Sequence, residues 1–151
     1  GYLVKKFVPL SHCLLLGACI LLAACEPAGR SAGLDFQNAW VRPVPPGMKM
    51  TAGFGSLGNP GPAAVEVTSV ASPQFGDVSL HRTEQSDGVS RMREVPALVI
   101  DAGASVALEP GGYHLMLMMP TTGIQPGQLV TLEFTVKDGR TFSFEVPVER
   151  R

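Results

Sequence analysis

The chain has 151 residues, which is enough for one domain of modest size, and its formal net charge at pH 7 is −1. Lysine and arginine form no basic patch, which argues against a nucleic acid as partner. All three cysteines, Cys13, Cys19 and Cys25, lie near the amino terminus. The rest of the chain has no C-x-x-C motif and no possible disulfide, which argues against a thiol oxidoreductase.

The first residues are typical of a secretory signal. Lys5 and Lys6 precede a mostly apolar run, residues 7–22, which is short for a membrane span that must cross about 30 Å. The run ends in Leu-Ala-Ala-Cys, which resembles the lipobox of bacterial lipoproteins, where the cysteine is lipidated after the signal is removed. This resemblance implies a signal peptide at residues 1–24, a lipid on Cys25 and a flexible linker over residues 25–33.

The remainder, residues 34–151, is then expected to be an exported domain that touches a membrane only through its lipid anchor. Several acyl chains would hold it stably, whereas a single chain binds only marginally. Glu26 follows the cysteine in place of the aspartate associated with retention at the inner membrane. We therefore expect a periplasmic domain, with the outer membrane favoured over the inner one.

From Leu34 onward the sequence shows short runs of β-branched and aromatic residues between glycines and prolines, and no helical period. There are 13 prolines in the chain, and the short alternating runs favour an all-β antiparallel sandwich or barrel. The predicted strands are 34–41, 51–57, 63–70, 78–83, 90–95, 105–109, 113–118, 129–137 and 140–147.

Two Asp-Gly pairs predict β-hairpins of type I′. Asp138-Gly139 lies between two alternating apolar rows, Leu132-Phe134-Val136 and Phe142-Phe144-Val146, which indicates one buried face. With Asp87-Gly88 as a two-residue loop, facing residues have numbers that sum to 175. Thr83 then lies opposite Met92, and His81 is its diagonal neighbour on the same face, at about 7 Å between Cβ atoms.

The strand from Tyr113 is rich in sulfur. Alternation predicts His114, Met116 and Met118 on one face and Leu115, Leu117 and Met119 on the other, the core face. Each histidine that follows Cys25 is thus predicted to have a methionine on the same face of its strand or of its hairpin. Two further methionines, Met48 and Met50, lie near a proline-rich turn, where they are expected to pack in the core or loop or to serve as accessory metal ligands.

The spacing of His81, Met92, His114 and Met116 is H-x10-M-x21-H-x-M. This spacing resembles the periplasmic copper chaperone family PCu(A)C, as do the phrases DGVSRMREV, AGASVALEPGGYHLML and PGQLVTLEFTVKDGR. The resemblance covers residues 34–148 approximately. It implies a Greek-key, cupredoxin-like sandwich, these four residues as copper ligands, and delivery of copper to the copper A centre of a cytochrome oxidase subunit or to a thiol-bearing insertion factor.

The donor types agree with copper. Thioethers are soft ligands that suit Cu(I), and two neutral methionines with two neutral histidines compensate one positive charge better than two. Zinc normally recruits cysteine, histidine or carboxylate, and a blue-copper centre needs a cysteine thiolate. Because imidazoles must be neutral to bind, affinity is expected to fall below about pH 6.

Other functions stay open to different degrees. A dismutase needs more than the two histidines beyond Cys25, and no G-x-S-x-G serine-hydrolase motif is present, so we expect no catalytic activity. Periplasmic copper storage or resistance is an alternative to delivery. A structural lipoprotein that binds no metal is another. Neither the acceptor nor the oligomeric state follows from the sequence.

Overall fold

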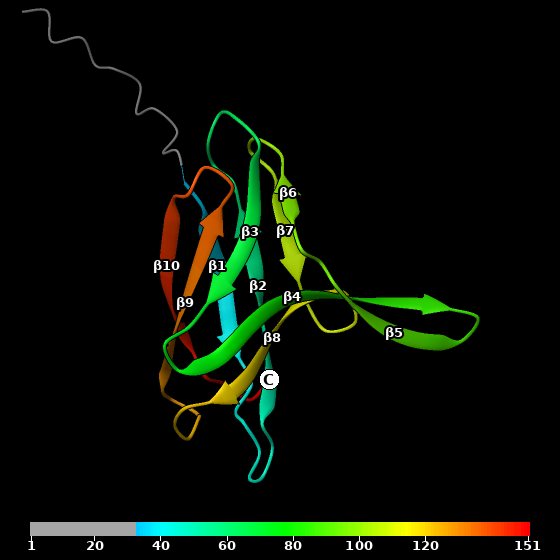
Figure 1. Cartoon of the computed structure of the whole chain (residues 1–151), viewed down its shortest axis with the longest axis vertical. Coiled ribbons are helices and arrows are strands. Elements are labelled where there is room, and N and C mark those ends of the chain that lie inside the picture. The colour runs from blue at the N-terminus through cyan, green and yellow to red at the C-terminus, as the bar shows by residue number, and fades with distance from the viewer. Residues whose placement is uncertain (1–32) are drawn as a thin grey trace, which may run out of the picture.

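The computed structural model describes residues 33–151, which form ten β-strands and no helix (Figure 1). The predictions for the signal peptide, Cys25 and the linker up to residue 32 lie outside the described residues. Within that described part, no helix is long and apolar enough to cross a membrane. The strands are β1 (Asp35–Val41), β2 (Met50–Gly58), β3 (Val65–Ala71), β4 (Phe75–Ser86), β5 (Val89–Glu94), β6 (Leu98–Ile100), β7 (Ser105–Leu108), β8 (Tyr113–Pro120), β9 (Leu129–Val136) and β10 (Thr141–Pro147).

The strands form two packed sheets, so the predicted all-β sandwich is confirmed. One sheet has the order β1-β2-β7-β8-β4-β5, with β2 also pairing with β8, and the other has the order β10-β9-β3-β6. Strand pairs are antiparallel except β7 with β8, which touch in parallel at Leu108 and Tyr113. All nine predicted strands are present. The additional strand β6 has only three residues, too few to show an alternation in the sequence.

Alternating apolar side chains from both sheets form the core. On β9 the alternation predicted from the sequence is visible as buried Val130, Leu132, Phe134 and Val136 between more exposed neighbours. Leu115 and Leu117 supply the matching face of β8 and are fully buried. The most completely buried apolar residues are Val41, Leu57, Ile100, Leu115, Leu117, Val130, Leu132, Phe134, Val146 and Val148.

The β9–β10 hairpin differs from the predicted type I′ turn. Phe134 faces Phe142, and the loop has three residues, 137–139, closed by a hydrogen bond from the Val136 N–H to the Arg140 carbonyl at 3.0 Å. A two-residue loop would have placed Phe134 opposite Ser143, with the two apolar rows on opposite faces. The shared buried face therefore selects the longer loop, with Gly139 at φ 93°.

Asp138 stabilises this loop. Its carboxylate accepts hydrogen bonds from the Arg140 backbone N–H at 3.0 Å and from Arg140 Nε at 2.8 Å. The backbone hydrogen bond, followed by the guanidinium, lowers the pKa of the Asp138 carboxyl below its ordinary value.

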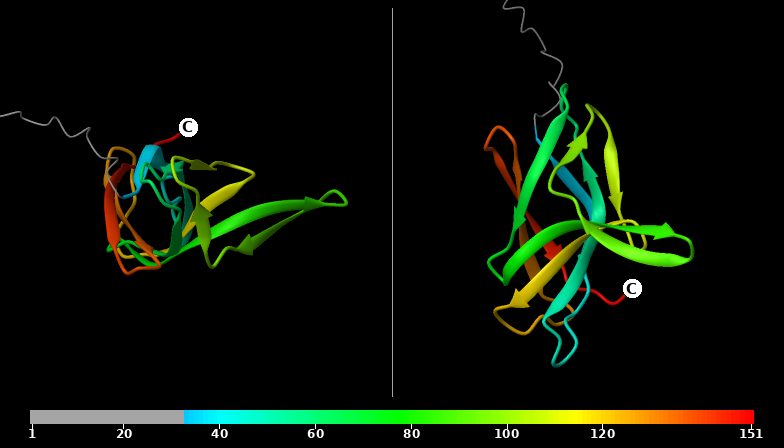
Figure 2. Two further views of the ribbon diagram at one scale, coloured as in Figure 1. Left: turned by 90° about the horizontal axis from the view of Figure 1, so that it is seen from above. Right: turned by 45° about the vertical axis from the view of Figure 1, so that its right-hand side comes forward.

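The β4–β5 hairpin agrees with the prediction. Thr83 faces Met92 and Ser86 faces Val89, and both loop residues have positive φ, 52° at Asp87 and 73° at Gly88, as a type I′ turn requires. Strand β4 is longer than predicted. Its first part curves along the sandwich, and its end extends away from the sandwich. The end of β4 and all of β5 project as an arm whose residues are exposed, apart from half-buried Thr83 (Figures 1 and 2). We call residues 82–94 the arm.

Candidate metal centre

The strand register places the four residues of the predicted site on one face of the six-stranded sheet. His81 on β4 lies directly opposite His114 on β8, and Met116 follows on the same face of β8, opposite Ser79. Met92 lies on β5, one diagonal step from His81. This is the outer face of the sheet, because Leu115 and Leu117 between these residues point into the core. The two predicted face assignments, His81 with Met92 and His114 with Met116, agree with this register.

The two imidazole rings lie close together and nearly parallel, with centroids 6.0 Å apart and 31° between the ring planes. Metal–nitrogen bonds are about 2.0 Å long, so two imidazoles on one ion place their centroids roughly 5–6.5 Å apart, depending on the angle at the metal. The observed separation falls in that range. The separation of the two rings is therefore compatible with one shared ion.

Each ring has one nitrogen with a hydrogen-bond partner and one without. His114 Nδ1 is 3.1 Å from the Gly112 carbonyl, and His81 Nε2 is 2.9 Å from Ser79 Oγ. The other two nitrogens, His114 Nε2 and His81 Nδ1, are buried and have no partner within the described residues. An unpaired buried nitrogen is costly, and its presence points to a ligand.

The partnered nitrogens orient the rings. Because a carbonyl only accepts, the proton of His114 lies on Nδ1, and the lone pair lies on Nε2. The Gly112 carbonyl also accepts the Thr83 N–H at 3.0 Å, which fixes it between β4 and β8. Donation of the second ring N–H to a carbonyl or hydroxyl is the usual way in which proteins orient histidines that bind metals.

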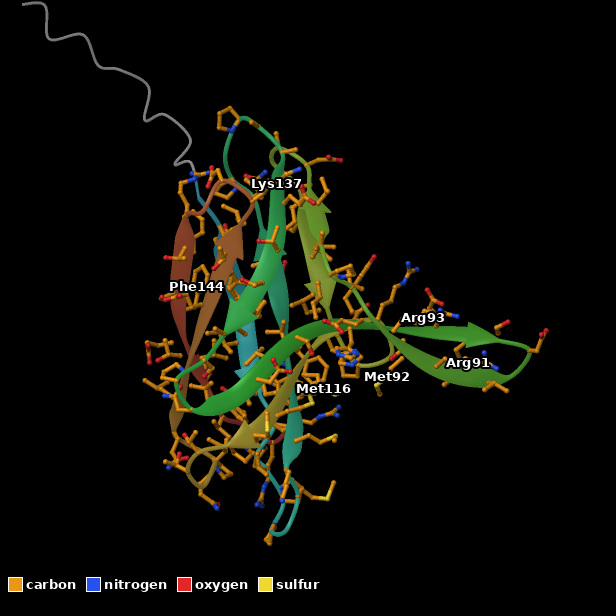
Figure 3. All side chains as sticks on the ribbon, viewed as in Figure 1. Arg91, Met92, Arg93, Met116, Lys137 and Phe144 are labelled. Carbon is orange, nitrogen blue, oxygen red and sulfur yellow. The ribbon has the colours of Figure 1, made fainter. Side chains whose placement is uncertain are left out.

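Met92 and Met116 line one groove together with His114. In a flat sheet their Cα atoms would lie about 17 Å apart, two strands across and four residues along. Both side chains nevertheless line the same groove, and Figure 3 labels them near one another below the arm. The groove has a volume of about 340 Å³. His81 does not line it, but its ring lies beside that of His114.

The other methionines do not all lie where the sequence predicted. Met48 and Met50 are 53% and 47% exposed and line the same groove, so the expectation of core packing is wrong for them. Met118 lies half-buried on the predicted face, opposite Met50. Met119, expected on the core face, is 56% exposed. Its φ of 55° ends the regular alternation of β8 at that residue.

The groove is poor in negative charge. In the described part of the chain, the one charged residue that lines it is Arg42, whose guanidinium stacks 4.8 Å from the centre of the Phe54 ring. No group of three histidine, cysteine, aspartate or glutamate side chains that could hold a metal occurs within residues 33–151. A hard divalent cation therefore lacks the oxygen ligands that it prefers.

Sequence reasoning missed Ser79 and Arg42. Ser79 lies two residues before His81 on the same strand face, so alternation alone could have identified it as a neighbour of the ring. Arg42 is the first residue of the β1–β2 loop, and its side chain lines the groove. No local sequence pattern indicates that contact.

The fold is shared with solved domains whose names include copper. The solution structure named CuI-DR1885 from Deinococcus radiodurans is 29% identical, with a TM-score of 0.66, over 85% of this chain and 87% of that one. The copper-bound PCuAC domain from PmoF2 shares the fold, with a TM-score of 0.65 at 16% identity, over 83% of this chain and 97% of that one. The cupredoxin-like fold and the resemblance to PCu(A)C proteins are thus confirmed.

The family described as "Putative lipoprotein LpqE-like" matches residues 34–148, and the chain belongs to it. A relative from Leifsonia xyli subsp. xyli, named "Putative lipoprotein Lxx21020", is 33% identical over 131 residues, which cover 85% of this chain and 78% of the relative. Both names agree with the lipobox at residues 22–25. Lipidation of Cys25 itself stays a prediction.

Proposed function

We propose that this protein is a Cu(I)-binding metallochaperone whose ligands are His81 Nδ1, His114 Nε2 and the sulfurs of Met92 and Met116. The observation that carries the proposal is the pair of buried, unpartnered imidazole nitrogens beside a groove lined by thioethers. Copper in the names of the solved relatives supports the choice of metal.

The electrostatics of the groove favour the monovalent ion. All four proposed ligands are neutral when they bind, and Arg42 adds a positive charge to the groove wall. At a given distance, Arg42 repels Cu(II) twice as strongly as Cu(I), because Coulomb energy is proportional to the charge. Soft sulfur donors add to this preference.

Delivery is favoured over storage by the position of Met92. This ligand is 61% exposed and lies on the projecting arm, whereas His114 is buried in the sheet. An acceptor that carries thiolates can replace the exposed thioether first and then remove the ion from the histidines one ligand at a time. A copper A centre in an oxidase subunit, or a thiol-bearing insertion factor, has the required ligands. With its lipid anchor the protein would act at the periplasmic face of a membrane.

Anaerobic titration with Cu(I) against a competing chelator tests the metal site. Wild-type protein is expected to take Cu(I) with high affinity, and His81→Ala and Met116→Leu are expected to lose at least tenfold in affinity. Met119→Leu is the matched control, because it makes the same substitution at another methionine of β8, one that does not line the groove. Equal affinities in all four proteins would refute the assignment, and a wild-type protein without Cu(I) would favour the structural lipoprotein.

Transfer is tested separately. Copper-loaded protein is mixed with an apo copper A domain, and formation of the copper A chromophore is followed under controlled redox conditions. Chromophore formation that is faster than from free chelated Cu(I) supports delivery. Retention of the copper by the loaded protein would favour storage or resistance.

A further inference from the structure

Met48, Met50 and Met118 extend the thioether face beyond the proposed centre. Met50 lies directly opposite Met118 on the neighbouring strand, and Ala52 lies opposite Met116, so all four belong to one face of the β2–β8 pair. Residues two apart on a strand are about 7 Å apart. Along β8 this places a donor at each step, from Met118 to Met116 and then to His114.

The β1–β2 loop holds Met48 over the same groove. The Met48 N–H donates to the Pro45 carbonyl at 3.0 Å, and the Met119 N–H donates to the Lys49 carbonyl at 2.8 Å, which ties the loop to the end of β8. Met48 and Met50 therefore line the groove with Met92 and Met116. Figure 3 shows the sulfur atoms gathered on the part of the molecule between the arm and this loop.

Core packing does not account for these side chains. Met48 and Met50 are about half exposed, although methionine normally fills gaps in the interior. Exposing them costs the burial energy of two apolar side chains, of which each is worth about 1.5–3 kcal/mol when fully buried. No carboxylate of the described chain lines the groove, so the donors available to an ion at this end are neutral and soft.

We propose that Met48 and Met50, which line the groove, and Met118, which lies opposite Met50, form a second Cu(I) site through which copper enters or leaves the histidine centre. This inference rests on the proposed function. The second site is weaker than the first, because it offers thioethers without imidazole. Copper remains Cu(I) throughout: one thioether binds the ion as another releases it, and no electron or proton is transferred.

Methionine methyl NMR tests the proposal directly, since the chain has six methionines and each gives one methyl resonance. The protein, labelled at the methionine methyls, is titrated anaerobically with Cu(I), and resonances are assigned by single Met→Leu variants. The first equivalent is expected to shift Met92 and Met116. The second is expected to shift Met48, Met50 and Met118 and to leave Met119 unmoved.

A double variant, Met48→Leu with Met50→Leu, is expected to lose the second equivalent and to release copper to bicinchoninate at least threefold more slowly than Met119→Leu. A double variant that still takes two equivalents, or a second equivalent that does not move the Met48 and Met50 methyls, overturns the second site and leaves the proposed function intact. A first equivalent that leaves Met92 and Met116 unmoved refutes the proposed function, and the relay with it.

Discussion

Replacing His114 by leucine should make the metal-free protein more stable while abolishing its response to copper. Leucine removes the buried Nε2 that has no partner, which relieves about 1–3 kcal/mol of desolvation cost. It also removes the hydrogen bond to the Gly112 carbonyl, worth about 0.5–1.5 kcal/mol. That carbonyl keeps the Thr83 N–H as a partner, so no new unpaired group is created.

The net effect is a gain of about 1 kcal/mol in the free energy of unfolding for His114→Leu, or roughly 4 °C in Tm for a domain of this size. Copper should stabilise the wild type but not the variant. At a free Cu(I) concentration one hundred times Kd, the wild type gains about 2.7 kcal/mol, whereas the variant gains nothing. Urea unfolding with and without Cu(I), followed by tryptophan fluorescence, measures both quantities.

Two results would refute this reasoning. A metal-free His114→Leu protein less stable than the wild type by more than about 1 kcal/mol would mean that the unpaired Nε2 costs less than the Nδ1 hydrogen bond to the Gly112 carbonyl contributes. A variant that copper still stabilises as much as the wild type would mean that His114 is not a ligand.

Three further outcomes are expected. Ser79→Ala should weaken Cu(I) binding about 10–100-fold in a chelator competition, because the His81 ring loses the hydroxyl that orients it; unchanged affinity would show that Ser79 is dispensable. Asn59→Ala should lower the free energy of unfolding by about 2–4 kcal/mol in urea, since the buried amide bonds the Ala63, Ile100 and Gly61 backbone; copper affinity should not change. The free energy of unfolding of Asp138→Asn should equal that of the wild type well below pH 3.8, the ordinary pKa of the carboxyl. Above that pH the variant should be less stable than the wild type. The lowered pKa means that the unfolded state binds more protons, so the stability due to Asp138 is lost on acidification; a difference that does not vary with pH would contradict this.

Local patterns carried much of the fold. The alternation in β9 and β10 identified the buried face, and Asp87-Gly88 fixed the β4–β5 register to the residue. Because a one-residue slip would have moved Met92 to the other face, that turn also predicted its place beside His81. The prediction of a two-residue turn at Asp138-Gly139 was wrong. The dipeptide alone favours such a turn, but the apolar rows on both sides of it select a three-residue loop.

Local sequence patterns could not predict contacts between segments that are far apart in the sequence. Pairing of β4 with β8, which places His81 opposite His114, joins segments 33 residues apart and leaves no local signal. The same holds for Arg42 and the exposed Met48, which reach the groove through a loop whose path depends on tertiary contacts. Such contacts depend on how whole sheets pack together. Neither the strand propensity of a segment nor the period of its apolar residues indicates that packing.

The arm that exposes Met92 to a proposed copper acceptor also exposes it to oxidants. At 61% exposure its sulfur meets solvent peroxide readily, whereas Met116 is half-buried in the sheet. In the proposed copper centre, oxidation to the sulfoxide would exchange a soft sulfur for a hard oxygen and attach a polar group at the groove, which would weaken a preference for monovalent copper. A site built from thioethers avoids disulfide formation, but restoring an oxidised Met92 would require a methionine sulfoxide reductase.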